Sequence, residues 1–209
     1  PPPPRRTDLR LGHRLEVTLD AAGRAASIRV QPEIIGPVST IDATAKTLTV
    51  NGALVKTNDG NASGPATVYD GYSGFAAIAV GDRVEIHGMP VLDASGHVAV
   101  QATRIERRPA GTVTLVTGVI ANLAGGAFNL GTLAVRLAPT VRILPPSTTL
   151  ANGMRVAVLS STGVAGGVLT ADIVRVRRAG DADTLVKLAG TIADWQTATK
   201  SFKLGAATV

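Results

Sequence analysis

The sequence of 209 residues has no cysteine, few aromatic residues and no long apolar run. Without cysteine there are neither disulfides nor thiolate metal sites. No stretch holds the about eighteen uninterrupted apolar residues of a membrane helix. Aromatic residues make up only 3% of the chain, which leaves few rings on which nucleic-acid bases could stack. These absences argue against a disulfide framework, a helical membrane span and an aromatic binding platform.

Short runs of Val, Ile and Thr dominate the rest, and 23 Gly and 12 Pro interrupt them. Apolar and polar residues alternate with a period of two, as in Leu48 and Val50 against Thr47 and Thr49. With 45% hydrophobic residues the chain can bury a sizeable core. The composition and period predict an all-β fold.

One six-residue phrase occurs twice, as LDAAGR from Leu19 and LDASGH from Leu92, and it belongs to a longer repeat. A segment with a shared glycine and arginine precedes each turn and occurs three times, as LGHRLEV (11–17), VGDRVEI (80–86) and NGMRVAV (152–158). A second segment, with a glycine followed by a β-branched residue, begins at Gly36, Gly118 and Gly190. Six matching half-units indicate a tandem repeat.

The order of the half-units predicts the domain organisation. We expect a Pro-rich spacer at 1–4, the C-terminal half of a repeat at 5–34, complete repeats at 35–108 and 112–178, and an N-terminal half at 185–209. About five short strands in each complete unit, joined by short linkers, fit a small barrel that closes on itself. The fold expected is therefore all-β, with tandem OB-like barrels and incomplete half-barrels at both ends.

The motifs G-x-[VI], V-N-G, v-G-D-R-V-E-V-x-G and A-T-R-I resemble those of a bacterial secreted or cell-surface repeat family, catalogued as a domain of unknown function. The resemblance is closest over Gly36–Arg108 and weaker over Gly118–Arg178. It implies tandem OB-like barrels and a secreted, periplasmic or cell-surface location. It implies no catalytic residue.

Chemistry is sparse in the sequence. Counting back from the turn places Leu92 opposite His97, so His87 and His97 lie too far apart to share a metal. His13 occupies the slot that Asp82 and Met154 fill in the other repeats, so the slot demands no imidazole. No nucleophile lies in a motif with a base, and no glycine-rich loop has the residues that hold phosphate. We expect no catalytic residue, no metal and no cofactor, and so no enzyme.

Two groups are candidate binding residues. Tyr69, Tyr72 and Phe75 form a candidate contact loop, unless their rings fold back on the barrel, whereas Phe128, Trp195 and Phe202 align with core positions. The net charge of +6 favours an anionic partner, unless the arginines only blunt sheet edges. The candidate anion-binding residues are Arg104, Arg107, Arg108, Arg175, Arg177 and Arg178. The repeated Arg14, Arg83 and Arg155 lie between inward apolar residues, so they are expected to point outward or to the rim.

These observations predict a non-catalytic structural or binding repeat module of a secreted or cell-surface bacterial protein. Its partners would be neighbouring repeats or other copies of itself, because an incomplete barrel leaves strand edges that invite another strand. The two terminal halves could pair within one chain, or head to tail between molecules, which the short linkers favour. The alternative is a basic OB-type module that binds nucleic acid or anionic polysaccharide.

Overall fold

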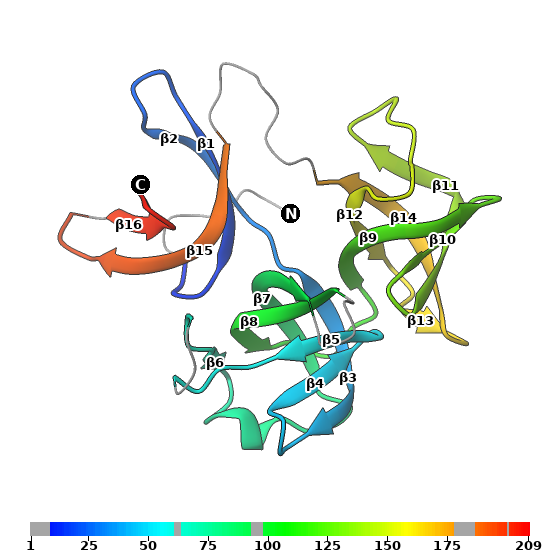
Figure 1. Ribbon diagram of the computed structural model, residues 1–209, viewed down its shortest axis with the longest axis horizontal. Coiled ribbons are helices and arrows are strands. Elements are labelled where there is room, and N and C mark those ends of the chain that lie inside the picture. Colours follow the sequence, from blue (N-terminus) through cyan, green and yellow to red (C-terminus); the bar gives the residue numbers. More distant parts are fainter. Residues whose placement is uncertain (1–8, 61–63, 93–97, 178–186, 200) are drawn as a thin grey trace.

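The structure is a computed structural model that describes residues 9–60, 64–92, 98–177, 187–199 and 201–209. The regular elements of these residues are β-strands and one short 3-10 helix, Phe75–Ala77, which confirms the all-β expectation. The strands form three lobes around a common centre, each with its own buried apolar cluster (Figure 1). Among the described residues, no helix has the length and apolar character needed to cross a membrane.

The first lobe is a closed five-stranded barrel with one additional strand. β3 pairs with β4, β4 with β5, β5 with β8, β8 with β7, and β7 returns to β3. The additional strand, β6, runs parallel to β8. Leu48 and Val50 point into the core and Thr47 and Thr49 away from it, as the period of two requires. The strands are β3 (Ile34–Asp42), β4 (Thr47–Val50), β5 (Ala53–Lys56), β6 (Val68–Asp70), β7 (Arg83–Leu92) and β8 (Val98–Arg107).

The second lobe closes in the same order. β9 pairs with β10, β10 with β11, β11 with β14, β14 with β12, and β12 returns to β9. The long strand β11 runs parallel to β14 in two stretches, around Val135 and again around Ile143. Phe128 is buried in this core, as expected. The strands are β9 (Thr114–Ala124), β10 (Ala127–Leu130), β11 (Leu133–Leu144), β12 (Arg155–Ser160), β13 (Val164–Ala165) and β14 (Val168–Val176).

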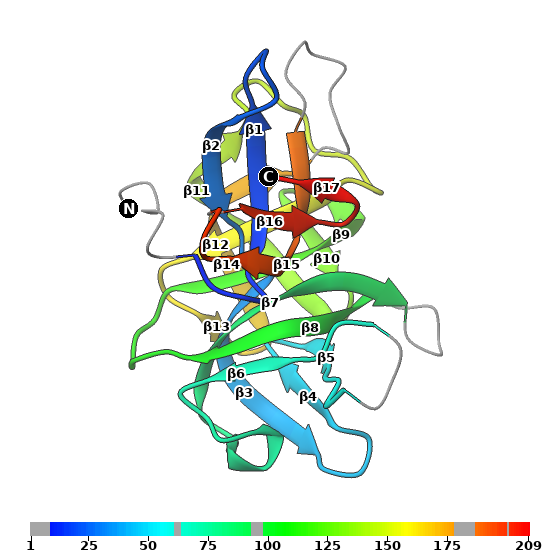
Figure 2. The same ribbon diagram turned by 90° about the vertical axis from the view of Figure 1, so that its left-hand side faces the viewer.

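The terminal lobe is built from the first two and the last three strands of the chain, which lie together in Figure 2. Its sheet has the order β17-β16-β15-β1-β2, with β1 antiparallel to β15. Phe202 is buried, but Trp195 is 37% exposed and stacks on it, so the expectation that Trp195 is core was wrong. The strands are β1 (Arg14–Leu19), β2 (Ala25–Val30), β15 (Lys187–Gln196), β16 (Ser201–Leu204) and β17 (Ala207–Thr208).

The terminal segments therefore pair within one chain, which was the less favoured of the two expected routes. Six buried apolar residues described in these segments form one core instead of two exposed half-sheets. Burying that surface and pairing the edges compensates for bringing the two ends together. Exchange of these strands between molecules stays a prediction.

One pairing register recurs in all three lobes. A glycine lies opposite the apolar residue that follows the repeated arginine, and two residues before the glycine an apolar residue lies opposite another apolar residue. At Gly36 the glycine is required by close packing, because a Cβ there would lie 2.1 Å from the side-chain amide nitrogen of Asn51. The glycine pairs are Gly36 with Val84, Gly118 with Val156 and Gly190 with Leu15. The apolar pairs are Ile34 with Ile86, Val116 with Val158 and Leu188 with Val17.

The lobes are joined in two different ways. The first and second share sheet hydrogen bonds, because β3 pairs with β9 through Ile34 and Ile35. The terminal lobe contacts the first through the loop before β1. There the Thr103 hydroxyl donates to the Gly12 carbonyl at 2.7 Å, and Arg104 donates to the Leu11 carbonyl at 3.1 Å.

Candidate functional site

The centre where the lobes meet is charged. Glu33 lies between β2 and β3, and its side chain is completely buried. Its backbone N–H donates to Ile86 of the first lobe at 2.8 Å, and its carbonyl accepts from Thr117 of the second at 2.9 Å. The Thr117 hydroxyl also donates to the carboxylate. These hydrogen bonds fix Glu33 between the first and second lobes, independently of its charge.

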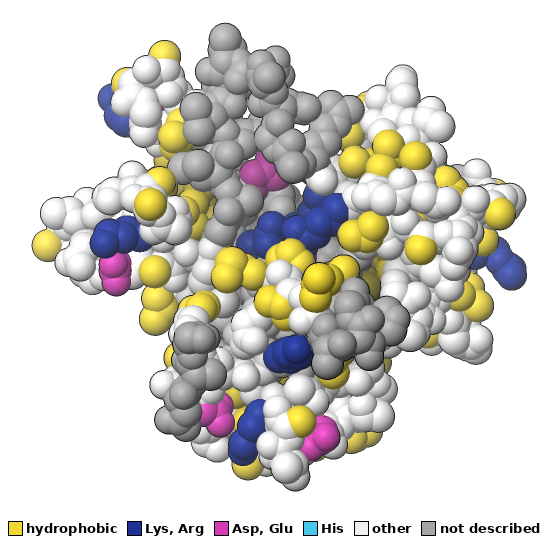
Figure 3. Space-filling view, in the orientation of Figure 1, with side chains coloured by type: hydrophobic (Ala, Val, Ile, Leu, Met, Phe, Trp, Pro, Cys, Tyr) yellow, Lys and Arg dark blue, Asp and Glu magenta, His cyan; other side chains and the backbone are white. Residues whose placement is uncertain are grey.

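Three arginines surround this carboxylate. Arg14 of the terminal lobe places Nε 2.9 Å from Oε1, and Arg155 of the second lobe donates to Oε2 at 2.8 Å. Arg177, directly after β14, lies 3.6 Å from Oε1 and donates to Gln31 and to the Pro32 carbonyl. Figure 3 shows basic side chains gathered in the hollow between the lobes. We call Glu33, Arg14, Arg155 and Arg177 the central ion cluster.

Burial shapes the electrostatics of the central ion cluster. It lowers the pKa of Arg177 to about 10, against the opposing effect of Glu33. It also lowers the pKa of Arg14, which Glu33 again opposes. Burial thus disfavours the charged form of these arginines, and the buried carboxylate of Glu33 stabilises it. Removing the Glu33 charge would leave buried positive charge without this compensation.

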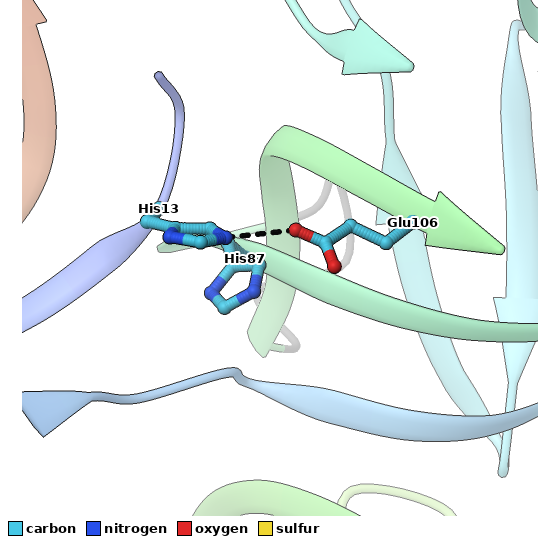
Figure 4. A group of neighbouring side chains, drawn as sticks. All are labelled: His13, His87 and Glu106. Carbon is cyan, nitrogen blue, oxygen red and sulfur yellow. Dashed lines mark hydrogen bonds and ion pairs between the residues drawn. The ribbon is translucent and has the colours of Figure 1, made fainter. Parts of the chain in front are cut away.

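A second polar group lies beside the central ion cluster, where the terminal lobe meets the first (Figure 4). The rings of His13 and His87 are 4.6 Å apart between centroids. His13 Nε2 lies 2.8 Å from Glu106 Oε1, and His87 Nε2 lies 3.1 Å from Glu85 Oε1. Both histidines are buried, and burial lowers the pKa of His87.

His13, His87 and Glu106 offer ligand atoms that all lie within 4.8 Å of one another, so we tested them as a metal site. The Nδ1 atom of His13 accepts the Arg10 backbone N–H at 3.1 Å, and that of His87 accepts the Arg14 N–H at 3.4 Å. Each neutral ring then carries its proton on Nε2 and donates it to a carboxylate. No ring lone pair is left for a metal, so the group fits a hydrogen-bonded contact between lobes.

Sequence reasoning missed this histidine pair. It compared His87 with His97, which lies outside the described residues, and not with His13. In the structure His87 is opposite Arg104 in the β7–β8 ladder, while His13 arrives from the loop before β1. A repeat-by-repeat alignment cannot reveal a contact between different repeats. The signal in the sequence was that the repeat position of His13 and that of His87 each hold histidine in a single repeat.

Most candidate anion-binding arginines already have acidic partners. Arg104 is buried and pairs with Asp70 and Glu106. Burial alone would raise the pKa of Glu106, but the hydrogen bonds from His13 and Arg104, with the charge of Arg104, lower it to about 2. Among the others, Arg107 pairs with Asp82, Arg108 with Glu85 and Arg177 with Glu33, Arg175 is exposed, and Arg178 lies outside the described residues.

The candidate contact loop packs largely on the first lobe. Phe75 is buried, and Tyr69 and Tyr72 are half-buried against the same core. Burial raises the pKa of Tyr69 to about 12 and also raises that of Tyr72. The Arg107 guanidinium lies 4.5 Å from the Tyr72 ring centroid. This placement agrees with the alternative in which the rings fold back on the barrel.

The repeated arginines lie at lobe boundaries. Arg14 and Arg155 point away from their own cores, as expected, but toward Glu33. The expectation of an outward, rim position misses that a neighbouring lobe covers Arg14, whose side chain is 11% exposed. Arg83 donates to the Val113 carbonyl at the start of the second lobe. In all three repeats, the arginine at this position therefore makes a contact between lobes.

Comparison with known proteins adds one finding. No curated protein and no solved structure matches the chain. A family model described as a domain of unknown function (DUF5666) matches residues 35–106, nearly the whole first lobe.

Proposed function

We propose that this chain is a non-catalytic structural and binding module, in which three copies of one OB-like barrel are held in a fixed arrangement by a buried ionic joint. The third copy is assembled from the two ends of the chain. The resemblance of the repeats to secreted and cell-surface proteins suggests that the module works there, presenting loops and edges to partners.

The pairing order supports the common barrel plan. In both closed lobes the first strand pairs with the second and the fourth, and the third runs parallel to the fifth. A five-stranded barrel with a Greek-key path is the plan of the OB fold. The terminal sheet supplies counterparts of all five strands, in the order β15, β16, β17, β1 and β2, because β17 pairs with β16 as β5 pairs with β4.

The observation that carries the structural role is Glu33. This carboxylate contacts arginines of the terminal and second lobes and bonds through its backbone to the first. A linker residue that only connected two flexible domains would not need to be fully buried among charges. Buried ionic groups can also fix one arrangement among several, and we assign that role to the central ion cluster.

Replacing Glu33 with Gln tests this role. The change keeps the side-chain shape but leaves three arginines without their counter-charge, so we expect unfolding to become easier by about 3–5 kcal/mol. Small-angle scattering should show a larger and more variable radius of gyration while circular dichroism still reports β-structure. Asp194→Asn removes a carboxylate from an exposed ion pair with Lys203 and is the matched control.

Unchanged scattering and stability in Glu33→Gln would contradict the ionic joint. An equal effect in Asp194→Asn would show that the loss of any carboxylate disturbs the protein, and would contradict it too. Hydrogen exchange on the same samples locates the opening, which should appear first at the strands that border Glu33.

A second candidate function, binding of an anionic polymer, is favoured by the second lobe. Between residues 112 and 177 the sequence contains a single acidic residue, Asp172. Arg136 and Arg142 of β11 and Arg175 of β14 are exposed, and these strands are neighbours in the sheet. Together they form a basic strip on one lobe, of the kind that tracks a polyanion backbone.

Retention on heparin and on single-stranded DNA across a salt series tests this candidate. The triple substitution of Arg136, Arg142 and Arg175 by Ala should lower the salt needed for elution and flatten its salt slope. The matched control removes three exposed cations of the terminal lobe, Arg24, Arg29 and Lys203. Equal losses in both triple variants would show charge-driven retention without a site.

A further inference from the structure

Buried polar atoms without a hydrogen-bond partner gather in one place. Five such side-chain atoms occur among the described residues, and four of them lie in or beside the central ion cluster. Each such atom costs free energy unless a partner satisfies it, so a concentration of them in a folded protein points to a bound water or ion. The four are Arg14 Nε, Arg177 Nε, Glu33 Oε1 and Thr191 Oγ1, and the fifth is the Tyr72 hydroxyl.

Thr191 extends this polar group to β15. It lies directly opposite Arg14 in the antiparallel pairing of β1 with β15, and residues paired in this way project their side chains from the same face of a sheet. Leu15, which follows Arg14, is buried in the terminal core, so the face that carries Arg14 and Thr191 is turned away from that core and toward Glu33. The Thr191 hydroxyl therefore lies on the side of the sheet that borders the central ion cluster.

Hydrogen-bond donors outnumber acceptors at this place. Arg14 Nε lies 2.9 Å from Glu33 Oε1, but the two atoms do not form a hydrogen bond of normal geometry. Arg177 already donates from both of its terminal nitrogens, which leaves Nε. Arg155 donates from one terminal nitrogen to Glu33, and its other two nitrogens donate to no described residue. A ligand that supplies acceptor oxygens would satisfy these groups.

The charge of the site also favours an anion. Three arginines face the carboxylate of Glu33, and Glu16 of β1 is the other acidic residue that affects Arg177, so one positive charge is in excess. Burial lowers the pKa of Arg177, and the charges of Arg14 and Arg155 lower it further, whereas Glu33 and Glu16 oppose them. The arginines thus repel one another in a partly dry site, where an additional anion is attracted more strongly than in water.

The hollow between the lobes gives access to this site. Basic side chains are visible there in the space-filling view (Figure 3). The side chain of Arg155 is 26% exposed, whereas those of Arg14 and Arg177 are each 11% exposed. A guanidinium group binds the oxygens of phosphate or sulfate with two parallel N–H groups. A ligand that enters beside Arg155 must be small to reach the two covered arginines, which favours a free inorganic oxyanion over a phosphate group carried on a larger molecule.

We propose that the central ion cluster binds one small tetrahedral oxyanion, such as inorganic phosphate, between Arg14 of the terminal lobe and the two arginines of the second lobe, with the Thr191 hydroxyl as a further donor. The anion would accept hydrogen bonds from the groups that Glu33 leaves without a partner. It would also join two lobes whose described strands belong to separate sheets. This site deepens the structural role proposed above and rests on the ionic joint, because it makes the arrangement of the lobes depend on the anion concentration around the protein.

Titration of the full chain with inorganic phosphate at constant ionic strength tests the site. We expect calorimetry to show saturable binding of one phosphate per chain. The melting temperature should rise with the phosphate concentration but not with chloride at the same ionic strength, because a ligand that binds the folded state stabilises it. O-phosphoserine, which carries the same group on a larger molecule, should bind more weakly. No saturable binding of phosphate, or tighter binding of O-phosphoserine, would overturn the proposal.

Two substitutions locate the site. Thr191→Val keeps the side-chain shape and removes a buried hydroxyl that has no described partner, so the fold should be retained while phosphate affinity falls about threefold or more. Arg155→Gln removes the most exposed of the three cations and should lower the affinity at least about tenfold. Thr170→Val and Arg136→Gln, at exposed positions of the second lobe, are the matched controls and should leave the affinity unchanged. Unchanged affinity in Thr191→Val or Arg155→Gln, or equal losses in the controls, would overturn the proposal.

This proposal and the proposed function can fail separately. Phosphate affinity reports on the anion site, whereas the scattering of Glu33→Gln without phosphate reports on the ionic joint. Absence of phosphate binding together with an expanded Glu33→Gln variant would remove the anion site and leave the structural role standing. Specific phosphate binding together with unchanged scattering of Glu33→Gln would do the reverse.

Discussion

The two closed lobes and the terminal lobe solve the same packing problem with different connectivity. In the first lobe every strand lies within one continuous stretch of sequence, whereas the terminal sheet pairs residues as distant as Leu15 and Gly190. The closed lobes pair their last strand on both edges, and the described part of the terminal lobe pairs β2 on one. The described strands of the first two lobes thus close into barrels, whereas those of the terminal lobe form an open five-stranded sheet.

This difference predicts unequal local stability. Among the residues whose burial is described, the terminal core contains six buried apolar residues, against twelve in each of the other clusters, so this part of it buries less apolar surface. Its pairing also closes a loop that contains both other lobes, which costs conformational entropy. We therefore expect the terminal lobe to open first, and the following substitutions test where that opening is controlled.

Among these substitutions the largest effect is expected from Gly12→Ala. Gly12, Gly81 and Gly153 occupy the same repeat position, with similar φ of +84, +90 and +86°. Alanine at any of them strains the backbone by roughly 1–2 kcal/mol. Only at Gly12 would the new Cβ meet another lobe, at 2.5 Å from the Thr103 carbonyl. We expect Gly12→Ala to destabilise the terminal lobe by roughly 2–3 kcal/mol, which is the backbone strain plus the loss of one buried hydrogen bond.

Gly81→Ala and Gly153→Ala are its controls, because a Cβ at either position would have no neighbour within 4 Å. Hydrogen exchange measured strand by strand separates the cases. Gly12→Ala should speed exchange in β1 and β15 far more than either control does in its own lobe. Three equal effects would mean that backbone strain alone matters and that the Gly12 contact does not hold the terminal lobe.

A middle-sized effect is expected inside the first barrel. Val84 is fully buried opposite Gly36, so Val84→Ala should leave a cavity and cost roughly 2 kcal/mol in the free energy of unfolding. Its neighbour Arg83 points away from the core and donates to the Val113 carbonyl. Losing that hydrogen bond through Arg83→Ala should lower the free energy of unfolding by about 1 kcal/mol or less. Similar melting shifts for the two variants would show that the assigned register is wrong.

The sequence was informative about elements and poor about contacts between lobes. The period of two and the repeated glycines predicted the strands and the equivalence of Gly36, Gly118 and Gly190, because both arise from local geometry. The exposure of Trp195 was missed, because its alignment with Ile41 assumes that neighbouring strands cover both positions equally. Coverage depends on strands elsewhere in space, which pattern alone does not report.

The candidate site shows the same limit. Arg14 and Arg155 stood out as repeated residues, and their outward direction followed from the buried residues beside them. That they converge on Glu33 depends on how three lobes pack, and no spacing in the chain encodes that distance. The meeting of His13 with His87 has the same origin, so a polar site built between repeats is the part that sequence reasoning predicts least.

The smallest effect concerns pH and the contact between the terminal and first lobes. His87 is completely buried, and burial lowers its pKa below the ordinary value of 6.5, although Glu85 and Glu106 oppose the shift and His13 adds to it. Below about pH 6.5 the unfolded chain therefore binds a proton that the folded chain refuses. Stability should fall as the pH drops below 6.5, by at most about 1.4 kcal/mol per pH unit from this group. Above that pH the group contributes no dependence.

Glu106 acts in a different window. Its pKa of about 2 in the folded protein keeps its contribution intact above about pH 4.5, from which it is lost as the pH falls toward 2. Unfolding midpoints between pH 7.5 and 5.5 therefore avoid the contribution of Glu106. His87→Gln retains a donor toward Glu85 and an acceptor for the Arg14 N–H but does not titrate, so it should flatten the slope. An unchanged slope, or an imidazole of His87 that titrates at its ordinary pH by NMR, would show that this contact between lobes does not respond to acid.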